Sequence, residues 1–367
     1  NFSRVLSVKY GKLLNDAAAT KSYTAIAVGR VMTCVLGMIV IREREIRDFV
    51  ETPFYRVLGY FTDGKIAAEW KAVEGSKYFN SPLLYKENGF KKEESAKQLM
   101  DELTGEKAIV ANLEKNISKK KAPLLFNLAE LQAECAKLFK ISPDQTLQIA
   151  QDLYERKLTT YPRTDARVLS TAVAKEIHKN IAGLRGYGHV AEFAAEILNA
   201  GSYKGIAKTR YVNDKQITDH YAIIPTGQLT ELNALNSLQK SVFDMICRRF
   251  LSIFYPPAIY QKVSLVTKIG DERFFSNMKV LAEEGYLEIW KPPVSKKKED
   301  NESKETEEET KFDLAFLESI KSLKKGQELE IQSLDIKTGE TSPPKRYNSR
   351  SIILAMENAG QLIEDEE

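Results

Sequence analysis

A tyrosine and an arginine two residues apart, Tyr161 and Arg163, could do covalent chemistry on a phosphate. Pro162 lies between them, has no N–H to donate and biases Tyr161 away from helical geometry, so the phenol is expected to project from an irregular turn. Arg163 adds a permanent cation with forked donors that suit a phosphate. A tyrosine oxygen can attack a phosphodiester when the developing charge is stabilised. On these residues alone, a packed Tyr161 and a surface ion pair of Arg163 remain the simpler interpretation.

The surrounding residues change this balance. The stretch Thr160-Tyr161-Pro162-Arg163-Thr164-Asp165 resembles the active-site motif of type IA DNA topoisomerases, most closely the bacterial topoisomerase III branch. Three other stretches resemble further signatures of that family, in the family's order: Val28 to Val31, Thr218 to Thr226, and Pro343 to Tyr347 with Ala355 to Gly360. One such motif would be weak, but the four together cover nearly the whole chain.

The resemblance implies an enzyme that cuts one DNA strand, passes another through the break and reseals it without ATP. Tyr161 would form a 5′-phosphotyrosyl bond, Arg163 would stabilise the phosphate charge, and His220 would orient the phosphate or assist proton movement. Because the phosphotyrosyl bond retains the energy of the phosphodiester, resealing needs no outside fuel. The partner is expected to be DNA, especially single-stranded segments. DNA contacts are expected from Arg30, Thr164, Asp165, Lys345 and Arg346.

The resemblance also implies Mg²⁺ for the parent enzyme, but with ligands outside this chain. The family's acidic cluster belongs to an N-terminal domain, and no Asp-x-Asp pattern with a partner glutamate stands out here. The chain starts at Asn1 without an initiator methionine and is expected to be a core fragment that is not fully active alone. Met32 and Ala166 stand where the family commonly has glutamine and serine.

Composition sets wide limits. Lys and Arg number 54 against 51 Asp and Glu, so a DNA surface would need local clustering of charge. Cys34, Cys135 and Cys247 lack metal-ligand spacing and are interpreted as buried residues in a reducing compartment. Without a signal peptide or an apolar run of about 18 residues, a cytoplasmic protein with no membrane contact is expected. The oligomeric state stays open, with a monomer as the simplest expectation.

The elements that must position Tyr161 are predicted to be helical. Residues 127–140 have one apolar face, and Ser142-Pro143 caps a second helix that runs to about Arg156. Two helices joined by a short turn are compatible with a helix-turn-helix-like unit. The inner face of the second helix is expected to carry Leu147, Ala150, Leu153 and Tyr154. Further helices are predicted at 33–46, 171–181 (capped by Ser170), 190–198, 236–250 and 349–359.

Strand patterns lie on both sides of this helical region. Residues 55–61 and 66–73 flank the hairpin signal Asp63-Gly64, and 107–113 is a further strand. Residues 259–268, 274–281 and 327–336 are expected to complete the same sheet. The lysine-rich stretch 115–121 could contact a DNA backbone, and a solvated loop is an equally good interpretation.

We therefore predict a multidomain α+β fold of helix-turn-helix-like modules and an antiparallel β arch domain. The predicted domains are a helical single-strand-groove segment (1–50), the first part of the arch (51–120), a helical domain with the nucleophile (121–253), the second part of the arch with a flexible charged loop at 295–311 (254–337), and a return to the groove domain (338–367). Two alternatives stay open: a non-catalytic helix-turn-helix DNA-binding module, and another tyrosine-nucleophile strand-transfer enzyme such as a recombinase.

Overall fold

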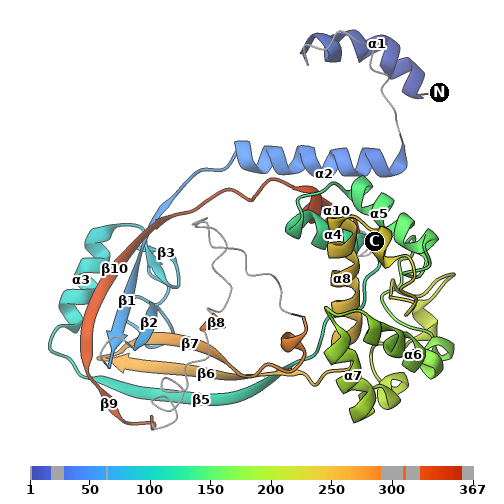
Figure 1. Cartoon of the computed structure of the whole chain (residues 1–367). Helices are drawn as coiled ribbons and strands as arrows, with labels where there is room; N and C mark the ends of the chain where they lie inside the picture. The colour runs from blue at the N-terminus through green and yellow to red at the C-terminus, as the bar shows by residue number, and fades with distance from the viewer. Residues whose placement is uncertain (1, 18–28, 63–64, 291–308, 311–322, 358–367) are drawn as a thin grey trace. The chain divides into compact units, whose positions relative to one another are not determined.

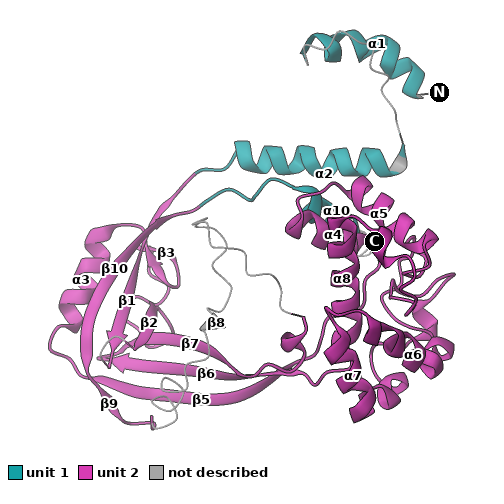
Figure 2. Ribbon diagram, viewed as in Figure 1, with its two compact units in different colours: residues 1–50, 342–367 teal, residues 51–341 magenta. Residues whose placement is uncertain are grey.

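The computed structural model describes residues 2–17, 29–62, 65–290, 309–310 and 323–357. The chain divides into two compact units, Asn1–Val50 with Ser342–Glu367, and Glu51–Thr341 (Figure 2). The predicted β arch and the predicted helical domain therefore fall in the same unit. The turn residues Asp63-Gly64, most of the charged stretch 295–311, and the end of the last predicted helix lie outside the described residues.

The first unit contains α1 (Phe2–Ala17), α2 (Arg30–Arg47) and α10 (Ser349–Glu357). The segment before α10 is bound to α2, because the Arg42 guanidinium donates to the Lys345 carbonyl at 2.6 Å and lies 4.4 Å from the ring centroid of Tyr347. The predicted helix at 33–46 is confirmed, and it begins three residues earlier. The expectation of a buried Cys34 is wrong, since this thiol is exposed on α2. The other two cysteines are buried as expected.

The second unit is built on one antiparallel sheet (Figure 1). Its central strands are β5 (Ala108–Lys120), β6 (Ala258–Ile269) and β7 (Glu272–Glu283), and β7 also pairs with β2 (Ile66–Lys71). β1 (Pro53–Phe61) pairs with β2 on one side and β10 (Ile331–Glu340) on the other. Short strands complete the described sheet: β3 (Leu84–Lys86), β4 (Gly89–Phe90), β8 (Glu309–Thr310, parallel to β7) and β9 (Glu328–Leu329). The two predicted strand blocks thus form one sheet.

The lysine-rich stretch is part of this sheet. Lys115 pairs with Val263 and Lys119 with Ile259, so β5 continues to Lys120 where a solvated loop was an open interpretation. The loop interpretation is wrong, because β6 pairs with β5 over the whole length of β5, and the residues of β6 are buried or half-buried. Polar residues can occupy a strand whose outer half faces water.

One face of the sheet is covered by a helix that was not among those predicted from the sequence. The helix α3 (Glu93–Leu103) buries Ala96, Leu99 and Leu103 against a core that includes Phe61, Trp70, Phe90 and Phe274. Inside this core the Glu272 carboxylate accepts hydrogen bonds from Trp70 Nε1 at 2.7 Å and from the Lys77 backbone N–H at 3.0 Å. A buried charge held by such donors fixes the neighbouring loop on the sheet.

The remaining part of this unit is helical. It contains α4 (Leu128–Leu138), α5 (Pro143–Glu155), α6 (Thr171–Gly183), α7 (Ala191–Ala200) and α8 (Ser237–Ser252), with short 3₁₀ turns η1 (Leu184–Gly186), η2 (Ser202–Lys208), η3 (Asp214–Gln216), η4 (Leu232–Ala234) and η5 (Gly285–Glu288). The predicted caps are confirmed: Ser142 forms a reciprocal capping box with Gln145, and the Ser170 hydroxyl accepts from the Val173 N–H. Figure 1 shows these helices gathered at one end of the long strands.

A buried arginine joins the helices to the end of the sheet. Arg249 of α8 is 4% exposed and lies between the rings of Phe126 and Trp290, 4.3 and 4.2 Å from their centroids. It donates to the Leu124 carbonyl at 3.1 Å. Burial lowers the pKa of Arg249 to about 10, and the nearby Glu134 and Glu130 carboxylates oppose that shift. No local sequence pattern predicts this double stack, because Phe126 and Trp290 come from distant segments.

Candidate active site

The turn that carries Tyr161 alternates buried and accessible side chains. Pro162 and Thr164 are buried, Tyr161 is half-buried, and Arg163 and Asp165 are exposed. The buried residues anchor the turn in the helical core, whereas the side chains with potential chemistry lie toward solvent. The turn is irregular, as expected, and the Thr164 N–H donates to the Pro162 carbonyl at 3.1 Å within it.

The turn is bonded to the second predicted motif. The Thr160 N–H donates to the Ile224 carbonyl at 3.0 Å, and the Thr160 hydroxyl both donates to the Ala222 carbonyl at 3.0 Å and accepts from the Ile224 N–H at 2.9 Å. The Thr164 hydroxyl donates to the His220 carbonyl at 2.9 Å. The structure therefore brings together two motifs that are far apart in the sequence.

Three aromatic rings meet at the turn. The Tyr161 ring centroid lies 4.5 Å from that of His220 and 5.3 Å from that of Tyr154, which packs on it edge to face at 79°. The predicted inner face of α5 is correct for Ala150 and Leu153, which are buried, but wrong for Tyr154, which is 40% exposed. Thr146 takes the additional buried position in α5.

Arg163 faces a shallow pocket beside α5. Its guanidinium has no hydrogen-bonding or ion-pair partner among the described residues, and the Tyr161 hydroxyl likewise has no partner there. The pocket, of about 380 Å³, is lined by Asp144, Leu147, Gln148, Gln151, Asp152, Glu155 and Arg163. An unpaired guanidinium two residues from an accessible phenol can bind an anion without first breaking an internal contact.

The other predicted DNA-binding residues have different surroundings. Thr164 is 6% exposed, and its hydroxyl is engaged with His220. Asp165 is exposed, and its carbonyl accepts from Asn127 Nδ2 at 3.1 Å. In the first unit, Arg346 forms a two-pronged ion pair with Glu43 at 2.8 and 2.9 Å. Arg30 is the first residue of α2 and its side chain is not described, and Lys345 is part of the segment bound to α2.

No group of three His, Cys, Asp or Glu side chains suited to a metal ion occurs within the described residues. The described residues therefore do not fit an Mg²⁺ site. Across the same part of the chain, none of the helices combines the length and the apolar character that crossing a bilayer requires.

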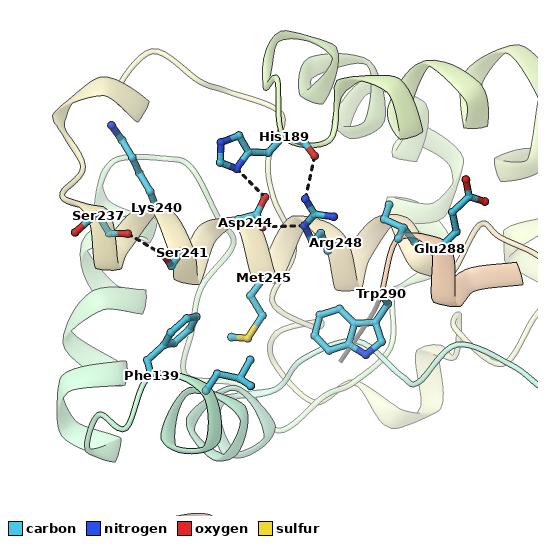
Figure 3. A pocket seen from close by; sticks show the side chains of 12 residues that line it. Phe139, His189, Ser237, Lys240, Ser241, Asp244, Met245, Arg248, Glu288 and Trp290 are labelled. Atoms are coloured by element: carbon cyan, nitrogen blue, oxygen red, sulfur yellow. Dashed lines mark hydrogen bonds and ion pairs between the residues drawn. The ribbon is translucent and has the colours of Figure 1, made fainter. Parts of the chain in front are cut away.

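A larger pocket in the same unit contains none of the predicted site residues. It encloses about 620 Å³ between α8, the end of α4 and η5, with Met245, Phe139 and Trp290 forming much of its apolar wall (Figure 3). Its charges are largely satisfied internally, since Arg248 donates to the Asp244 carboxylate at 2.8 Å and to the His189 carbonyl at 3.2 Å. This pocket could not be predicted from the sequence, because its lining comes from four separate segments.

The chain, with its sheet and inserted helices, belongs to the type IA DNA topoisomerase family. The matching family model is described as DNA topoisomerase and covers residues 1–361. DNA topoisomerase 3 of Bacillus subtilis is 31% identical over 354 residues, which cover 96% of this chain and 44% of that protein. The Bacillus licheniformis DNA topoisomerase 3 is 32% identical over 352 residues, with the same coverage. The chain thus spans less than half the length of these relatives.

The fold is similar to that of the full-length topoisomerase I from Thermotoga maritima. The TM-score is 0.62 at 22% identity, and the alignment covers 98% of this chain and 52% of that one. The predicted family and the α+β fold class are confirmed. Membership of this family supports the topoisomerase interpretation over both alternatives, the non-catalytic helix-turn-helix module and the recombinase.

Proposed function

We propose that the full-length protein is an ATP-independent DNA topoisomerase that cleaves one strand through Tyr161, passes another strand and reseals the break. The packing of Tyr161 against His220, two residues from the exposed and unpaired Arg163, is the observation that carries the proposal. Single-stranded DNA is the proposed substrate, because an extended strand exposes both its phosphates and the faces of its bases. We also propose that the protein is cytoplasmic and monomeric, and that it requires Mg²⁺ bound by residues outside the described ones.

In this mechanism the Tyr161 oxygen attacks the phosphorus, a P–O bond forms to tyrosine, and the bond from phosphorus to the 3′ oxygen breaks. The phenol proton leaves the nucleophile, and the departing 3′ oxygen ends as a hydroxyl. Arg163 binds the phosphate oxygens as charge develops, and the His220 imidazole hydrogen-bonds the phosphate or carries the proton. Resealing is the reverse attack by the 3′ hydroxyl.

Thr164 has a positioning role in this proposal. Its hydroxyl ties the turn to the His220 backbone, so it sets the separation of the nucleophile and the imidazole. Contacts of Asp165, Arg30, Lys345 and Arg346 with DNA remain proposals that rest on the family resemblance.

The test is Tyr161→Phe in the full-length protein. The ring and its packing remain, and only the attacking oxygen is removed, so binding of single-stranded DNA is expected to persist while the covalent adduct and relaxation of supercoiled DNA disappear. Denaturing electrophoresis of a labelled oligonucleotide measures the adduct, and mass spectrometry of the digested adduct identifies the tyrosine and the attached DNA end. Cleavage at the wild-type rate by the Tyr161→Phe variant would refute the assignment.

A further inference from the structure

We propose that Tyr154 is a base-stacking residue that binds a base of the single strand within about two nucleotides of the phosphodiester attacked by Tyr161. The inference rests on the proposed function and adds to it a specific contact with the substrate. It starts from an anomaly in α5. The apolar pattern of this helix assigns Tyr154 to the core, yet the side chain is 40% exposed.

The ring of Tyr154 is held beside the nucleophile. It packs edge to face on Tyr161 with centroids 5.3 Å apart, and its hydroxyl has no hydrogen-bonding partner among the described residues. A strand advances about 3.4 Å per stacked nucleotide, so a base on Tyr154 would belong to a nucleotide close to the reacting phosphate. Exposed aromatic rings are the usual platforms for bases of single-stranded nucleic acid.

The charges along α5 favour bases over phosphates on this side of the strand. The pocket next to Arg163 is lined by the carboxylates of Asp144 and Glu155, which would repel a phosphate, and by Asp152, whose charge is paired with Arg156 at 3.0 Å. Arg163 supplies the cation at that pocket. A strand that places its phosphate at Arg163 would therefore turn its bases toward α5.

The same pocket offers groups for the edge of a base. The side chains of Asp144 and Gln148 have no hydrogen-bonding partner among the described residues, whereas Gln151 donates to Glu155 at 3.0 Å. A carboxylate and an amide oxygen both accept from the exocyclic amino groups of cytosine or adenine. Tyr154 itself does not line this pocket, so these acceptors would serve a different base of the strand from the one that Tyr154 stacks.

The experiment is a double-mutant cycle between Tyr154 and the DNA. The cleavage site of an oligonucleotide is first mapped with the wild-type full-length protein, and single abasic positions are then placed up to two nucleotides on each side. Affinity for each oligonucleotide is measured by fluorescence anisotropy in a Tyr161→Phe background, which needs no cleavage. The covalent adduct is measured in parallel with Tyr161 intact.

Tyr154→Leu is expected to weaken binding of the intact oligonucleotide about tenfold, within the range for loss of one base–aromatic stack. Removal of the stacked base at one abasic position should weaken binding to the protein with Tyr154 intact by a similar factor. At that position Tyr154→Leu should cause no further loss of affinity. Tyr154→Phe should match wild type. Phe79→Leu is the matched control, because Phe79 is a 46% exposed aromatic in the loop between β2 and β3 and should leave binding unchanged.

An equal loss on intact and abasic oligonucleotides would overturn the inference and make Tyr154 a support for the Tyr161 ring. No effect of Tyr154→Leu on affinity would also overturn it. Thermal unfolding of each variant shows whether a loss reflects misfolding, and Tyr154→Phe repeats the comparison with the fold preserved. Absence of a wild-type covalent adduct would refute the proposed function separately; abasic positions scanned along the whole oligonucleotide would then decide by affinity alone whether Tyr154 stacks a base.

Discussion

The Tyr161 turn and the Arg249 stack each contain an arginine, but the two side chains differ in exposure and in bonding. Arg163 is exposed and unpaired within the described residues, whereas Arg249 is enclosed by two rings and bonded to a backbone carbonyl. The first arginine keeps its donors available to an incoming anion. The second has given up its hydration to hold the helices against the end of the sheet. The comparison shows that the same residue type can serve substrate or structure, depending on what encloses it.

Arg163→Ala should show the largest effect, and on activity alone. Loss of one donor to a developing anionic charge costs on the order of 1,000-fold, so the rate of adduct formation should fall by about that factor. The free energy of unfolding should change by less than about 0.5 kcal/mol, since the side chain is exposed. Oligonucleotide cleavage and urea unfolding measure the two quantities. Arg163→Lys should recover only part of the rate, because it keeps the charge and loses the planar fork.

Arg249→Ala should show the opposite pattern. It removes two ring contacts and a hydrogen bond from a buried site, so the free energy of unfolding should fall by about 3 kcal/mol. The free energy of unfolding of Arg249→Lys should lie between those of the wild type and Arg249→Ala, because an ammonium group is not planar and cannot stack on the rings. If Arg249→Ala abolished cleavage in a protein of unchanged stability, the contrast between the two arginines would be wrong.

Glu43→Gln should show the smallest effect. The Arg346 side chain donates hydrogen bonds to Glu43 and lowers the pKa of this carboxyl below 4.5, but both side chains are well exposed. A carboxyl with a lowered pKa stabilises the fold above its ordinary pKa and loses that contribution as the pH falls through the lowered value. Thermal unfolding should therefore distinguish the variant from wild type slightly at neutral pH and not at all below the lowered pKa. A difference that persists in acid would show that the ion pair is not its source.

Those parts of the structure that depend on short-range sequence signals could be predicted. The caps at Ser142 and Ser170 and the pairing of two strand blocks followed from turn and capping residues. The helix α3 was missed although its first turn carries Glu93 and Glu94, a charge pattern that suits a helix start. Its apolar residues Ala96, Leu99 and Leu103 also recur at helical spacing, so the local signal was present and was overlooked.

The site was predictable only in part. The motifs identified Tyr161, Arg163 and His220, but spacing along the chain could not show that Thr160 and Thr164 would bond to the second motif. Helical periodicity placed Tyr154 in the core. Periodicity shows which residues share a face of the helix, but it cannot show which other segments cover that face. The role of Arg249 depends on Trp290, which arrives from the far end of β7. Such contacts between distant segments arise from tertiary packing and leave no local pattern.

The pairing of β5 with β6 has a consequence for synthesis on the ribosome. The whole helical insertion, residues 121–257, must be made between these two neighbours, so β5 emerges before its main partner exists. A domain synthesised from its N-terminus exposes such an unpaired edge for some time. Lysines along an edge discourage association with other chains, and β5 carries Lys115, Lys119 and Lys120 in its outer half. These lysines are therefore expected to discourage association of the nascent chain with other chains until β6 has been made.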